Sequence, residues 1–167
     1  MVKLVDPKST LWNYLLPEQR EIVEDCEKLI EDAHLHPKEL SDYAYVVFPL
    51  AKVYEGFLKK FLLDSGLISR QQYESDHFRI GKVLNPNLPD HLRLEGLYDK
   101  ICSQIGNKDV PERFWQTWKR GRNVLFHYFP SHLQRISLSE AQTIASEIVA
   151  TMESALSTCK IPTSMIS

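Results

Sequence analysis

Apolar residues recur at helical spacing along most of the 167-residue chain, and no run shows the two-residue alternation of a strand with hairpin turns. The segments with the clearest helical spacing are residues 17–33, 38–64, 90–105, 111–130 and 139–158. Residues 1–10 and 159–167 are expected to be irregular. The pattern therefore predicts an all-α antiparallel bundle of about five helices, in a single domain spanning residues 1–167.

Within these segments the apolar positions predict which faces are buried. The first helix has its apolar stripe at Ile22, Cys26, Leu29, Ile30 and Ala33. Its acidic residues, Glu27 among them, are assigned to a solvated outer face. The helix at 38–64 is apolar around most of its circumference, which indicates contacts on more than one side, and Pro49 is expected to bend it. Ser139 is the expected N-cap of the last helix, with Gln142 completing a capping box.

The helix that opens at Pro111 carries ionisable groups inside an aromatic pattern. Its apolar face is formed by Trp115, Trp118, Leu125, Phe126 and Phe129. Arg122 falls within that face, and a buried guanidinium costs several kcal/mol unless a carboxylate, a phosphate or a dimer partner meets it. Asn123 and His127 are four residues apart and are expected to share one edge of the same helix. The helix thus offers a fixed cation, an amide and an imidazole within about two turns.

Two polar residues interrupt the apolar band of the helix at 38–64. Lys52 and Glu55 are three residues apart and are therefore neighbours on its surface. They could form an ordinary exposed pair. The alternative, about equally supported, makes Glu55 the carboxylate that meets Arg122 across the helix interface, with Lys52 as a second cation at the mouth of a site.

Charge and cysteine usage narrow the class of protein. The chain has 20 Lys and Arg against 22 Asp and Glu, so any contact with nucleic acid must come from a local patch. Cys26, Cys102 and Cys159 are widely spaced and lack metal-binding spacing, which favours reduced thiols. The N-terminus has no apolar leader core and no apolar run approaches a membrane span, so a cytoplasmic protein with no membrane partner is expected. The scattered histidines predict no metal and no cofactor.

The run RNVLFH, from Arg122 to His127, resembles the R-X4-6-H signature of HEPN domains, the nucleotide-binding domains of higher eukaryotes and prokaryotes. The stretch FPLAKVYEGFLKKFL also resembles a helix in the C-terminal, HEPN-type domain of RNase LS toxins, although Lys52 stands where arginine is expected. Those toxins carry further N-terminal domains. The resemblance implies an all-helical, metal-independent endoribonuclease of toxin or phage-defence type.

The same resemblance implies roles for five residues. His127 would act as general base or acid for the 2′-hydroxyl attack and for protonation of the leaving group. Arg122 would hold the scissile phosphate and stabilise its charge in the transition state. Asn123 would orient the imidazole or a phosphate oxygen, and Glu55 and Lys52 would complete the catalytic set.

The resemblance also implies partners. Catalytic HEPN proteins form a homodimer in which two motif helices face each other and build one cleft for RNA. Here Arg113, Lys119 and Arg120 would supply the positive field along the RNA backbone, although such a cluster is equally common on ordinary charged helix edges. An antitoxin protein would be a further partner.

Two alternatives remain open. HEPN-like bundles also serve as non-catalytic dimerisation or regulatory interaction domains, and a pair between Arg122 and Glu55 would then be structural. A related toxin class is neutralised by an adenylyl-transferring partner and carries the longer motif R-X4-H-x-Y. That class is disfavoured here, because Phe129 replaces the tyrosine and has no hydroxyl to modify.

Overall fold

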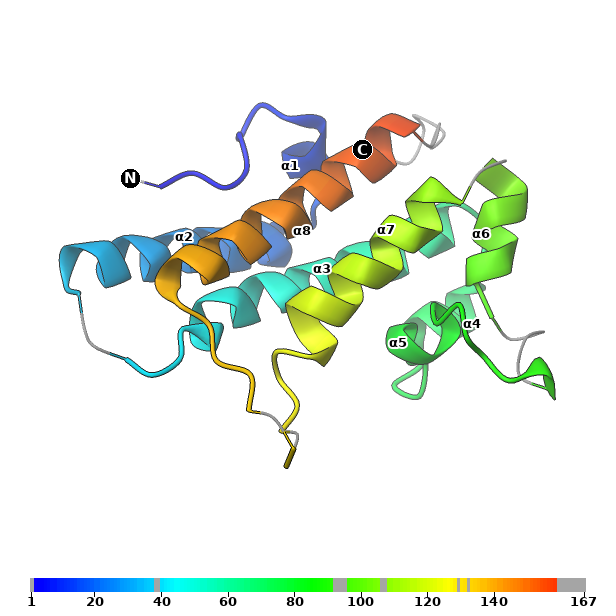
Figure 1. The fold of residues 1–167 in the computed structure, drawn as a ribbon. Coiled ribbons are helices and arrows are strands. Elements are labelled where there is room, and N and C mark those ends of the chain that lie inside the picture. The colour runs from blue at the N-terminus through cyan, green and yellow to red at the C-terminus, as the bar shows by residue number, and fades with distance from the viewer. Residues whose placement is uncertain are drawn as a thin grey trace.

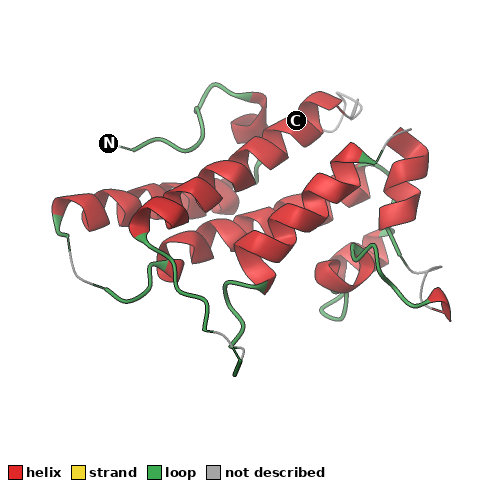
Figure 2. Cartoon of the chain, in the orientation of Figure 1, coloured by secondary structure: helices red, strands yellow, loops and turns green. Residues whose placement is uncertain are grey.

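The computed structural model describes residues 2–37, 40–91, 96–105, 108–128, 130–131 and 133–158. All regular secondary structure in these ranges is helical, as Figure 2 shows. The helices are, in chain order, α1 (Thr10–Tyr14), α2 (Pro17–Leu35), α3 (Ala44–Asp64), α4 (Arg70–Glu74), α5 (Ile80–Val83), α6 (Tyr98–Ile105), α7 (Asp109–Trp118), the π-helix η2 (Lys119–Asn123) and α8 (Leu138–Thr158). The predicted all-α class is confirmed, and the end segment 159–167 lies outside the described residues.

Helices α2, α3, α7 and α8 form a bundle in which α2 and α7 run one way and α3 and α8 the other (Figure 1). The short helices α4, α5 and α6 lie together at one end, between α3 and α7 in the chain. Helix α3 packs against α2, α8, η2, α4 and α5. It is therefore the central helix of the fold, as its wide apolar band predicts.

The core is built around the aromatic side chains of α3. Tyr54, Phe57 and Phe61 are at most 1% exposed, and full burial of such a side chain stabilises the fold by about 1.5–3 kcal/mol. Phe61 meets Phe114 of α7 edge to face, with ring centroids 5.4 Å apart. The Tyr54 hydroxyl donates a hydrogen bond to the Phe114 carbonyl at 3.0 Å, and burial raises the pKa of this phenol, so it stays a donor. These contacts fix α7 against α3.

Several predicted helix boundaries were wrong. The helix expected at 38–64 begins at Ala44, because the Asp42 carboxylate accepts the Ala44 N–H at 3.0 Å and holds the preceding loop; residues 38–39 lie outside the description. The helix expected at 90–105 begins at Tyr98, since residues 96–97 are not helical, while 92–95 are not described. The short helix α5 lies between the predicted helical segments 38–64 and 90–105.

The N-cap of the last helix also differs from the prediction. Ser137, rather than Ser139, caps α8, because its hydroxyl accepts the Glu140 N–H at 3.2 Å. The Glu140 carboxylate in turn accepts the Ser137 N–H at 2.8 Å. A carboxylate is a stronger acceptor than the Gln142 amide, so this capping box takes precedence.

The N-terminal segment is irregular up to Ser9, as expected, but it changes the predicted face of α2. Glu27 is only 3% exposed rather than part of a solvated acidic face. Its carboxylate accepts the Leu4 N–H at 2.8 Å and pairs with Lys3 Nζ at 2.9 Å. Because the segment covers this side of α2, the buried stripe shifts to Gln19, Val23, Cys26, Glu27, Ile30 and Ala33.

The helix that carries the motif changes its winding within the motif. It is α-helical from Asp109 to Trp118 and π-helical from Lys119 to Asn123, and the Val124 N–H bonds the Lys119 carbonyl at 2.8 Å. Gly121 is buried at this turn. A Cβ built on it would lie 3.0 Å from Ile148 Cδ1 of α8. The absence of a side chain therefore lets η2 approach α8 closely.

We expect Gly121→Ala to destabilise the fold by about 1 kcal/mol net, because overpacking costs about 1–3 kcal/mol and alanine regains at most about 1 kcal/mol of helix propensity. Ile148→Val removes the methyl group that the new Cβ would meet. In urea unfolding, the double variant should be more stable than the sum of the two single changes predicts. Strict additivity would show that this contact does not limit the approach of η2 to α8.

Candidate functional site

An ion pair between α3 and η2 forms the centre of the candidate site. Arg122 Nη2 lies 3.0 Å from Glu55 Oε2, with side-chain exposures of 41% and 27%. The sequence left open whether these two residues meet, and the structure confirms the contact. The expectation that Arg122 lies within a buried face is corrected, because its side chain is partly exposed to solvent.

The aromatic ring of Trp118 also contacts this guanidinium. The Arg122 Cζ lies 4.7 Å from the centroid of the Trp118 ring, a cation–π geometry. Trp118 is itself buried at 4% exposure and rests against α5, where a Cβ on Gly81 would lie 2.6 Å from its Nε1. The sequence assigns Trp118 to the apolar face and gives no signal for Gly81, since their proximity depends on the tertiary fold.

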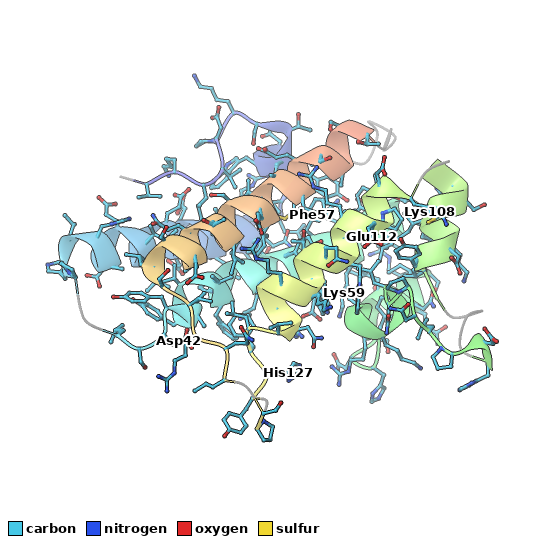
Figure 3. The ribbon with its side chains drawn as sticks, viewed as in Figure 1. Asp42, Phe57, Lys59, Lys108, Glu112 and His127 are labelled. Carbon is cyan, nitrogen blue, oxygen red and sulfur yellow. The ribbon has the colours of Figure 1, made fainter. Side chains whose placement is uncertain are left out.

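His127 lies beyond the helix rather than on it. After η2, the Phe126 N–H donates a hydrogen bond to the Arg122 carbonyl at 3.1 Å. His127 is exposed on the loop that follows (Figure 3). The prediction that Asn123 and His127 share a helix edge is therefore wrong. His127 follows Arg122 by five residues in the chain, and Asn123 is half-buried at the end of η2.

The other predicted cations are distributed around this centre. Lys52 is exposed on α3, three residues before Glu55. Arg120 points toward α8 instead, where its Nη1 forms an ion pair with Glu147 and lies 2.6 Å from Glu147 Oε2. Arg113 and Lys119 are exposed on α7 and η2. The structure thus brings together Arg122, Glu55 and the neighbouring Lys52, while Arg120 is held against α8.

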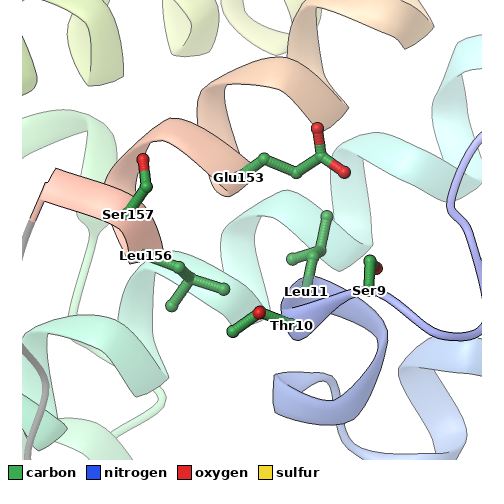
Figure 4. A pocket seen from close by; sticks show the side chains of 6 residues that line it. All are labelled: Ser9, Thr10, Leu11, Glu153, Leu156 and Ser157. Atoms are coloured by element: carbon green, nitrogen blue, oxygen red, sulfur yellow. The ribbon is translucent and has the colours of Figure 1, made fainter.

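Two cavities of the described residues are lined by residues other than Arg122 and Glu55. One of about 270 Å³ lies between α1 and the last turns of α8 (Figure 4), and it is lined by Ser9, Thr10, Leu11, Glu153, Leu156 and Ser157. Another of about 180 Å³ lies on the α8 side of η2, beside Arg120 and Val124. A guanidinium site open at the surface suits a polymer with accessible phosphates better than an enclosed small molecule.

Two further features concern metals and membranes. In the described ranges, His, Cys, Asp and Glu do not gather in the groups of three or more that could hold a metal ion. The same residues include no helix that is both long and apolar enough to span a bilayer. Cys26 and Cys102 are free thiols, and burial raises the pKa of Cys26 to about 12, so its thiolate is scarce at neutral pH.

Comparison of the chain with protein-family models, with curated proteins and with solved structures gives no match. The function is therefore inferred from the residues of the site alone.

We expect a double-mutant cycle with Glu55→Gln and Arg122→Gln to give a coupling of about 0.2–1 kcal/mol, the usual range for a pair this exposed. Urea unfolding measures it, and added salt should reduce it. The matched control combines Glu55→Gln with Arg120→Gln, which should be additive because Arg120 pairs with Glu147. Equal coupling in both cycles would contradict a specific contact between Glu55 and Arg122.

Proposed function

We propose that this protein is a metal-independent endoribonuclease whose site is centred on Arg122 and His127. The observation that supports the proposal is a permanent cation held in one orientation by Glu55 and Trp118 while 41% of its side chain stays exposed. One carboxylate does not use all five N–H donors of a guanidinium, so donors remain for a phosphate. The exposed side chain of His127 follows five residues later in the chain, on the loop after η2.

The reaction we propose is an internal transesterification. The imidazole of His127 takes the proton of a ribose 2′-hydroxyl, whose oxygen attacks the adjacent phosphorus. The bond from phosphorus to the 5′-oxygen breaks, and that oxygen takes up a proton from an imidazolium. The products are a 2′,3′-cyclic phosphate and a 5′-hydroxyl. Arg122 stabilises the additional negative charge on the phosphate oxygens in the transition state.

A homodimer built on the motif turn completes the proposed site. Two copies of His127 would then face one phosphate, so that one imidazole accepts the proton and the other supplies it. Lys52 and Lys119, both exposed, contribute positive charge along the RNA, and Asn123 orients a phosphate oxygen or the imidazole. The biological setting we propose is a toxin or phage-defence effector in the cytoplasm, held in check by an antitoxin protein.

Purified wild-type protein should cleave RNA in EDTA, and His127→Ala should reduce the rate by roughly 10²- to 10⁴-fold, the range for loss of a general acid or base. His77→Ala is the matched control, because His77 is also exposed and lies on the loop after α4. Circular dichroism and sedimentation check that each variant is folded and has the wild-type oligomeric state. Intact RNA with folded, dimeric wild type would refute the nuclease proposal.

The second candidate function is a non-catalytic interaction domain. It is favoured by six large apolar side chains that are exposed on the end of α2, on the start of α3 and in the loops before α3 and after η2, namely Leu35, Leu40, Tyr45, Phe48, Tyr128 and Leu133. The loop before α3, which carries Leu40, and the loop after η2, which carries Tyr128 and Leu133, are joined, because the Tyr43 N–H bonds the Ile136 carbonyl at 3.0 Å. In this reading the pair of Arg122 with Glu55 is structural. Expression toxicity that His127→Ala abolishes would count against it.

A further inference from the structure

An aromatic side chain projects from α3 beside the candidate site. Phe48 is 52% exposed, although its helix neighbours Val46, Val47 and Leu50 are fully buried. Burying a phenylalanine side chain is worth about 1.5–3 kcal/mol, so an exposed ring on the central helix requires an explanation.

Helical spacing aligns Phe48 with the polar residues of the site. Lys52 follows it by four residues and Glu55 by seven, so the three lie along one stripe of α3, and Lys59 continues the stripe four residues further. The seven residues from Phe48 to Glu55 span about 10 Å of helix. The ring is therefore close enough for a base whose neighbouring phosphate is held at Arg122.

The turn after η2 contributes a second aromatic ring that contacts Phe48. Phe126, one turn after Arg122, meets Phe48 edge to face, with ring centroids 5.4 Å apart. This contact fixes the orientation of Phe48 while half of its surface stays open. Two aromatic rings thus lie beside the ion pair, one contributed by α3 and one by the turn after η2.

Charge indicates what this surface binds. Along the stripe, Lys52, Lys59 and Arg122 contribute three positive charges against the one carboxylate of Glu55. A polyanion is therefore favoured along this side of α3.

We propose that Phe48 is a stacking platform for an unpaired base, and that the chain accordingly selects single-stranded RNA. The combination of a half-exposed aromatic ring with adjacent cations is the arrangement that sequence-tolerant single-strand binders use. In a duplex the base faces are already stacked, so the ring offers them nothing. As a statement about substrate the inference rests on the proposed ribonuclease function, but the binding it predicts can be measured without cleavage.

The test uses the full wild-type chain and a fluorescent 2′-O-methyl RNA of about a dozen unpaired nucleotides, which the proposed reaction cannot cut. Fluorescence anisotropy compares it with the same strand in a duplex. The single strand should bind more tightly, and Phe48→Leu should weaken its binding by roughly 5- to 100-fold, the loss of one stacked base. Phe48→Trp keeps the aromatic face and should bind as wild type does.

Leu35→Ala is the matched control for loss of an exposed apolar side chain, because Leu35 is 68% exposed on α2. Thermal unfolding checks that the Phe48 variants remain folded. Unchanged binding by Phe48→Leu, an equal loss in Leu35→Ala, or equal binding of duplex would each overturn the platform. A dimer that Phe48→Leu dissociates, with RNA binding unchanged, would assign this ring to a protein interface instead.

The two proposals fail in different ways. Wild type that binds the single strand through Phe48 but leaves ordinary RNA intact refutes the nuclease and keeps the platform. Wild type that cleaves RNA while Phe48→Leu binds normally refutes the platform and keeps the nuclease.

Discussion

The permanent charge of Arg122 is the constraint around which this end of the bundle is built. A guanidinium keeps its proton at any physiological pH, so the helix that carries it must give it either solvent or a partner. Here it has both, because Glu55 of α3 pairs with it at 3.0 Å while 41% of the side chain stays exposed. The ring of Trp118 also contacts the guanidinium and lies against Gly81 of α5. Arg122 thus connects η2 directly with α3 and α7, and through Trp118 with α5.

The turn η2 carries both arginines of this arrangement. Arg120 and Arg122 lie two residues apart and therefore point to different sides of the turn, so that Arg120 reaches Glu147 on α8 and Arg122 reaches Glu55 on α3. Gly121 lies between them and lets the turn approach Ile148. The chain then leaves the helix, which exposes His127 and brings Phe126 against Phe48. The ion pair and the aromatic contact consequently both connect α3 with η2 and the residues that follow it.

The sequence predicted those parts of this picture that depend on local periodicity. The apolar band of α3 was identified because burial on several sides leaves few polar positions, and Glu55 stood out against it. The π-helical turn, the buried Glu27 and the capping of α8 by Ser137 were not predicted, because each depends on a tertiary neighbour or on a choice between two similar caps. The aromatic contact of Phe48 with Phe126 was missed because residues 78 positions apart meet only in the fold.

The most direct test asks whether Arg122 and His127 promote attack by a ribose 2′-hydroxyl. The ends produced from one RNA in EDTA are mapped first. The reaction is then repeated with a single 2′-deoxy substitution at the cleaved nucleotide. The account predicts a 2′,3′-cyclic phosphate and a 5′-hydroxyl from the first RNA, and no cleavage at that position in the second. Cleavage of the deoxy substrate, or 5′-phosphate ends, would mean that water is the nucleophile and would contradict the role assigned to this site.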